Sequence, residues 1–165
     1  MIDLPATPQI VLGKVIVPAL ELLPAQMDSP QARVMLVAIM LQESGLRTRQ
    51  QQNGPAHGLA QCEQPVMQLL LDNPASAKLV RELCHSRAVA PVASDMYWAV
   101  LTDDIFAAAI ARLILWCDPA PLPAVGDADE AWACYLHVWG PGKPRPQDWP
   151  NNYRAALSAV TGGNA

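Results

Sequence analysis

The stretch from Pro30 to Glu43 constrains the fold more than any other part of the chain. Its residues Val34 to Leu41 are all apolar, so a helix over this range has no polar face for about two turns. Ser29-Pro30 is a typical helix start, and Gly45 is a typical helix end. A helix that is apolar on every side is stable only when other elements cover it, so we expect a buried central helix.

Further helix signals follow along the chain, whereas the alternation typical of strands is weak. A second apolar helix is predicted from Asp103 to Trp116, with Thr102 as its N-cap. Its single interior charge, Arg112, is expected to be buried and ion-paired near Asp118 or Glu43. We therefore predict an all-α fold, a single domain of about seven helices.

Asp127 and Glu130 predict another helix start, because this spacing is typical of a capping box. Long loops are predicted at residues 46–58, 118–126 and 140–150, where glycine, proline and polar residues gather.

Composition excludes several classes of function. The net charge of −4 argues against nucleic-acid binding, which needs a concentrated basic surface. The two most apolar windows are shorter than the roughly 20 residues of a membrane span. The first residues lack the positive region of a signal peptide, so we expect synthesis in the cytoplasm without one. The four cysteines and three histidines show no metal-ligand spacing, and we expect free thiols, no metal and no cofactor.

Glu43 is the leading candidate for chemistry. It lies on the last turn of the apolar helix, where burial and the negative end of the helix dipole both disfavour a charged carboxylate. Its pKa should therefore be raised, as a general acid requires near neutral pH. The alternative interpretation is a solvated glutamate at the point where the helix leaves the core.

The segment after Glu43 adds a second motif. Glu43-Ser44 is followed, fifteen positions after the glutamate, by Gly58-Leu59-Ala60-Gln61. This pair of motifs resembles the lytic transglycosylases of the lysozyme superfamily, including phage-encoded members, which carry Glu-Ser at the end of a buried helix and then Gly-Leu-Met-Gln. Ala60 replaces the methionine of that pattern.

A third segment, from Tyr135 to Pro144, resembles the Tyr-Asn-Ala-Gly-type element of the same family. Trp139-Gly140-Pro141-Gly142-Lys143 is similar to its end, whereas His137 and Val138 stand where tyrosine and asparagine are expected. This departure leaves open whether Tyr135 or His137 assists Glu43. The chain is also similar to uncharacterised small phage and prophage proteins.

The resemblance covers roughly residues 32–142 and implies a lysozyme-like domain. We divide the chain into an N-terminal helical extension (1–28), a catalytic core (29–142) and a C-terminal strap and helix (143–165).

The family's chemistry implies cleavage of the peptidoglycan glycan strand between N-acetylmuramic acid and N-acetylglucosamine. Glu43 would act as general acid and then as base, and the C6 hydroxyl of muramic acid would attack to give a 1,6-anhydro product. A hydrolytic muramidase is an alternative, but it needs a second carboxylate. Glu63 follows Gln61 closely, but a solvated helix start explains it better.

Six further residues are expected to bind substrate, most of them with a structural alternative. Ser44 either contacts the sugar or bonds its own helix, and Gln61 either binds an N-acetyl group or anchors its loop. His57 borders the groove or lies on a surface loop. Tyr135 or His137 assists the acid, and Trp139 stacks on a sugar ring or packs the last helix.

Two other functions stay open. One is a catalytically inactive relative that serves as a phage structural or saccharide-binding protein. The other is a helical phage assembly or regulatory protein. With either enzymatic interpretation, the protein would reach the cell wall after lysis, by export through other means, or as a component of a virion.

Overall fold

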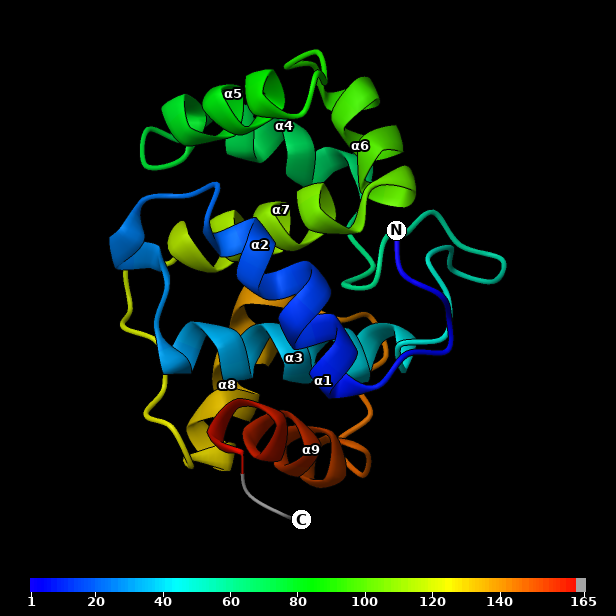
Figure 1. The fold of residues 1–165 in the computed structure, drawn as a ribbon, viewed down its shortest axis with the longest axis vertical. Coiled ribbons are helices and arrows are strands. Elements are labelled where there is room, and N and C mark those ends of the chain that lie inside the picture. The colour runs from blue at the N-terminus through cyan, green and yellow to red at the C-terminus, as the bar shows by residue number, and fades with distance from the viewer. Residues whose placement is uncertain (163–165) are drawn as a thin grey trace.

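The computed structural model describes residues 1–162 and confirms the all-α fold: this part of the chain forms eight helices and no strand (Figure 1). The first helix is a continuous run of α1 (Pro8–Val11), η1 (Leu12–Ile16) and α2 (Val17–Leu20), and a short turn η2 (Ala25–Met27) follows it. The other seven are α3 (Pro30–Ser44), α4 (Gln64–Asp72), α5 (Ala77–Ser86), α6 (Ala93–Thr102), α7 (Asp104–Trp116), α8 (Ala128–Trp139) and α9 (Trp149–Thr161). Residues 163–165 of the predicted C-terminal segment lie outside the described range.

Helix α3 is the buried centre, as its apolar sequence predicts. Every side chain from Val34 to Met40 is at most 1% exposed. Helix α9 packs along α3, and η1 and α7 cover other sides of it. Figure 1 shows α4, α5 and α6 at one end of the molecule and α8 and α9 at the other, with α3 and α7 between them.

The predicted ends of α3 are confirmed. The Ser29 hydroxyl accepts a hydrogen bond from the Ala32 amide at 3.1 Å, and Pro30 occupies the first turn. Gly45 ends the helix with φ +59°, a left-handed conformation that glycine adopts without strain. The capping residue of α8 is also confirmed, because Asp127 accepts from the Glu130 amide at 3.0 Å.

The predicted cap of α7 is wrong. Thr102 is the last residue of α6, and its hydroxyl donates back to the Trp98 carbonyl at 3.1 Å. Asp103 caps α7 instead, with Oδ1 accepting from the amides of Ile105 and Phe106 at 3.0 and 3.1 Å. A carboxylate can accept from both amides, and its negative charge is favoured at the positive end of the helix dipole. Aspartate is therefore a better cap here than the neighbouring threonine.

The predicted ion pair of Arg112 is also wrong. The side chain is buried, 4% exposed, but its Nε donates to the Met27 carbonyl at 2.8 Å rather than to a carboxylate. Its guanidinium carbon lies 5.3 Å from the centre of the Trp116 ring. Arg112 therefore holds the turn η2 onto α7.

The N- and C-terminal segments belong to the same hydrophobic core as the middle of the chain. Val11 and Val15 from the first helix and Tyr153 and Ala156 from α9 all join the cluster built around α3. Within residues 1–162, no helix is both long enough and apolar enough to cross a membrane.

Replacing Asp103 should test the corrected cap. Asp103→Ala removes the two amide hydrogen bonds and an ion pair in which the Arg87 Nε lies 2.8 Å from Oδ2. We expect the free energy of unfolding, measured by urea denaturation, to fall by about 1–2 kcal/mol. Asp103→Asn keeps the cap and should lose less. Thr102→Ala should stay within about 0.5 kcal/mol of wild type; a larger loss there than at Asp103 would contradict the assignment.

Candidate active site

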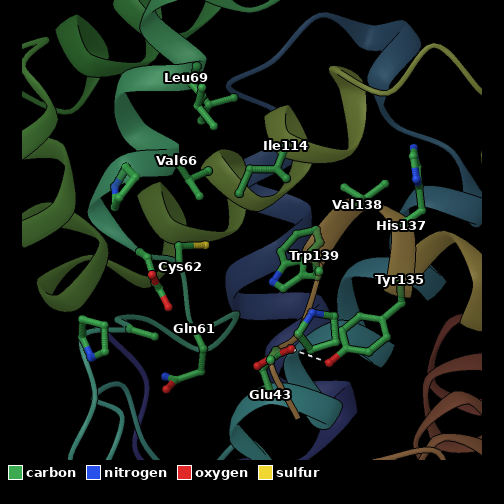
Figure 2. Close-up of a pocket in the computed structure, with 18 of the residues that line it drawn as sticks. Glu43, Gln61, Cys62, Val66, Leu69, Ile114, Tyr135, His137, Val138 and Trp139 are labelled. Atoms are coloured by element: carbon green, nitrogen blue, oxygen red, sulfur yellow. Dashed lines mark hydrogen bonds between the residues drawn. The ribbon is translucent and has the colours of Figure 1, made fainter. Parts of the chain in front are cut away.

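A groove of about 1300 Å³ lies between α4 and α8. Its lining comes from the last turn of α3, the loop of residues 45–63, helices α4, α7 and α8, and residues 140–148 between α8 and α9, which we call the strap. Figure 2 shows Val66, Leu69, Ile114 and Val138 along one part of the groove and Glu43, Gln61 and Tyr135 along the other.

Glu43 and Tyr135 form the central contact of this groove. The Tyr135 hydroxyl donates to Glu43 Oε1 at 2.6 Å. The tyrosine is 2% exposed, and its ring packs in a cluster with those of Trp132 and Trp149, at centroid distances of 5.2 and 5.3 Å. This cluster fixes the direction of the hydroxyl, while Glu43 stays only partly buried and faces the groove.

Of the two residues that sequence left open as partners of Glu43, the structure brings Tyr135 to it. His137 lies two residues further along α8, and Figure 2 shows it pointing away from Glu43. Its side chain is 76% exposed, and Nε2 lies 3.7 Å from a carboxylate oxygen of Asp118. His137 still lines the groove, at its rim.

Burial raises the pKa of Glu43, while the Tyr135 hydrogen bond and the charge of Arg145 partly offset that rise. The direction agrees with the expectation from the helix end. A raised pKa keeps the carboxyl protonated to higher pH, and a nearby donor and cation stabilise the carboxylate once the proton leaves. Tyr135 is itself a secure donor, because burial and Glu43 raise the pKa of its hydroxyl.

The conformation of the loop that carries Gly58 to Gln61 places Gln61 in the same groove as Glu43. Gly58 has φ +75°, and a Cβ there would lie 2.7 Å from Val100 Cγ1, so no other residue fits without movement. The side-chain amide of Gln61 donates from Nε2 to the Gly58 carbonyl at 2.6 Å. Trp139 lines the groove, and its Nε1 donates to the Ala60 carbonyl at 2.9 Å.

Gln61 therefore anchors its loop, as one of its two interpretations predicts, and Trp139 fastens the same loop; sugar binding by either side chain stays a prediction. One edge of each side chain anchors the loop, and the rest of it lines the groove.

Two predicted substrate-binding residues are not brought to the groove. The Ser44 hydroxyl donates to the Met40 carbonyl at 2.9 Å, within its own helix. His57 is 3% exposed, rather than on a surface loop, and its ring stacks on Tyr97 at a centroid distance of 4.0 Å. Neither side chain lines the groove.

Sequence reasoning missed Arg145 and its partner Gln42, which link the strap to the end of α3. Arg145 stands among prolines in the predicted loop of residues 140–150. No spacing rule relates it to a residue so far away in sequence. The apolar wall from α4 was also missed; it includes Leu69, which is 66% exposed.

Within residues 1–162, no cluster of three histidine, cysteine, aspartate or glutamate side chains is placed to hold a metal ion. Cys62 lines the groove as a free thiol, and burial raises its pKa to about 12, so it stays neutral.

Comparisons with known proteins add no relative: no family model matches the chain, and neither a curated protein nor a solved structure does.

Gly58→Ala should destabilise the protein by about 2 kcal/mol or more, because the methyl group meets Val100 and the left-handed backbone is strained with a side chain. Urea denaturation measures this. Gly13→Ala is the control, since a Cβ at Gly13 meets no atom within 4 Å and the variant should be as stable as wild type or more. Equal stability of both variants would refute the close approach.

Tyr135→Phe should raise the pKa of Glu43 further, because the lost hydroxyl favours the ionised carboxyl. Titration of the Glu43 carboxyl by ¹³C NMR, assigned with Glu43→Gln, measures the shift. Tyr97→Phe is the control, since that hydroxyl bonds the Pro55 carbonyl and should leave Glu43 unchanged. A fall in the pKa of Glu43 in Tyr135→Phe would show that the hydroxyl does not donate to the carboxylate.

Proposed function

We propose that this protein cleaves the glycan strand of peptidoglycan between N-acetylmuramic acid and N-acetylglucosamine, with Glu43 as general acid and base. The observation that carries the proposal is Glu43 itself: a partly buried carboxyl with a raised pKa, held by a buried tyrosine and open to a long groove. The choice of substrate comes from the resemblance of the sequence motifs to those of lytic transglycosylases.

The groove suits an extended saccharide. Sugar rings have apolar faces and polar edges, and the groove offers the Trp139 ring and the aliphatic wall of α4 beside polar groups. Gln61 Oε1 has no hydrogen-bond partner in the described part of the chain, so it is free to accept from a hydroxyl or an N-acetyl amide.

In the first step, Glu43 gives its proton to the glycosidic oxygen as the bond to the anomeric carbon breaks through an oxocarbenium-like transition state. The carboxylate that forms keeps the hydrogen bond from Tyr135. In the second step, this carboxylate takes the proton of the attacking hydroxyl, and Glu43 returns to its starting form.

We favour attack by the substrate's own C6 hydroxyl over attack by water. A two-carboxylate mechanism needs a second acid aimed at the anomeric carbon. The other groove carboxylates are otherwise explained: Asp118 faces His137, and Asp72 accepts hydrogen bonds from Gln68. Glu63 is an exposed residue at the N-cap of α4. Hydrolysis by a muramidase is the outcome that would reassign one of them.

An inactive, saccharide-binding relative is the second candidate. Ser44 supports it, because the serine of the Glu-Ser motif bonds its own helix instead of lining the groove. The altered third motif at His137 and Val138 points the same way. In both cases the setting we propose is a phage or prophage protein that meets the cell wall after lysis, by export, or in a virion.

Digestion of purified peptidoglycan, with mass spectrometry of the released muropeptides, tests the proposal. Wild type should release 1,6-anhydro products, and Glu43→Gln should lower the rate at least about a hundredfold. Glu63→Gln, at the other glutamate of the groove, should remain active within a few-fold. Reducing-end products would indicate hydrolysis. No release by folded wild type, together with retention on cell walls, would favour the inactive relative.

The Glu43→Gln variant should fold well, which makes the comparison interpretable. When folding raises the pKa of a carboxyl, the free energy of unfolding of the protein falls as the pH rises through that pKa. Glutamine removes this loss and keeps an oxygen for the Tyr135 hydroxyl, so the variant should be at least as stable as wild type at pH 7.

A further inference from the structure

The strap is tied to the last turn of α3 by a reciprocal pair of hydrogen bonds. Gln42, 1% exposed, donates from Nε2 to the Arg145 carbonyl at 3.0 Å. In return, Arg145 Nη2 donates to the Gln42 carbonyl. Asn152 on α9 completes the set by donating to Gln42 Oε1 at 2.8 Å. Both polar ends of the buried amide are therefore satisfied by residues more than a hundred positions away.

This contact places a cation next to the candidate acid. The Gln42 carbonyl belongs to the peptide group that joins Gln42 to Glu43, so the guanidinium lies at the C-terminal end of α3. That end carries the negative pole of the helix dipole, which favours a cation. Asp148 holds the other side of the guanidinium, with Nε to Oδ2 at 2.9 Å. Arg145 is 47% exposed and lines the groove with Glu43.

The titratable groups around Glu43 come from three elements. Tyr135 on α8 donates a hydrogen bond, Arg145 on the strap supplies positive charge, and Cys62 on the loop of residues 45–63 is a buried, neutral thiol. Within residues 1–162, Arg145 is the cation that influences Glu43. Lys143 also lines the groove, but it is exposed and makes no ion pair among the described residues.

We propose that Arg145 is a positioning residue of this site: held by Gln42 and Asp148, it stabilises the ionised form of Glu43. The inference rests on the proposed function in one respect, namely the step of the reaction in which Glu43 is ionised. When the glycosidic C–O bond breaks, its electron pair and the Glu43 proton both go to the leaving oxygen. Glu43 then carries a full negative charge until it takes the proton of the attacking hydroxyl.

This role accounts for features that packing alone does not explain. Gln42, held by Asn152, already fixes the backbone of the strap. A strap with a purely structural role therefore does not need a charged side chain at this contact. The guanidinium instead stays half-exposed at the groove, where preorganised charge lowers the energy of a transition state in which carboxylate develops.

Kinetics of Arg145→Met and Arg145→Lys test the role in catalysis. Loss of the cation should lower kcat about tenfold with KM changed less than about twofold, because the charge acts on the transition state. The alkaline limb of the pH–rate profile should move to higher pH, since the carboxylate is less favoured without the cation. Arg145→Lys should recover most of both effects. Arg154→Met, which removes an exposed arginine of α9, is the matched control and should change neither.

Titration of the Glu43 carboxyl by ¹³C NMR separates this inference from the proposed function, because it needs no substrate. The pKa of Glu43 should be higher in Arg145→Met than in wild type and close to wild type in Arg145→Lys and Arg154→Met. If Arg145→Met does not fold, Arg145→Gln keeps an amide donor for the Gln42 carbonyl and replaces it.

An unchanged titration in the neutral, folded variant overturns the inference even if peptidoglycan is cleaved. A shifted titration in a protein that cleaves no peptidoglycan supports the role of Arg145 and refutes the proposed function.

Discussion

The burial of α3 is the constraint on which the rest of the structure depends. A helix without a polar face must be covered all round, and the chain meets this need with elements from both ends and the middle: η1, α7 and α9. Because α9 packs along α3, the strap before it must cross the end of the central helix. The wall of the groove is therefore a consequence of how the core is closed.

The candidate site lies where this buried helix reaches the surface. Glu43 is close enough to the core to be poorly solvated and close enough to the groove to meet a ligand. Tyr135, fixed by Trp132 and Trp149, and Arg145 from the strap supply what solvent would otherwise provide to the carboxylate. A general acid that must later act as a base needs this balance, with burial on one side and a donor and a cation on the other.

The wall of the groove that is formed by the loop of residues 45–63 depends on backbone geometry rather than on charge. Gly58 lets the loop pass against Val100, and Trp139 then fastens the Ala60 carbonyl to the end of α8. The loop is thus fastened to α8 on the side of the groove that faces Glu43. Side chains that serve this wall, such as His57 under Tyr97, are taken out of the groove.

Sequence alone determined the features that local chemistry controls. The apolar run of α3, its caps at Ser29 and Gly45, and the position of Glu43 on the last turn follow from residue order, because helix periodicity and capping act within a few residues. The same reasoning failed at Thr102, where a neighbouring aspartate competes for the same amides. Only the tertiary structure decided which side chains meet. It turned Ser44 and His57 away from the groove. It also brought Tyr135 rather than His137 to Glu43 and Arg145 to the Gln42 carbonyl, because these contacts depend on how α9 packs on α3 and α8 packs on α9.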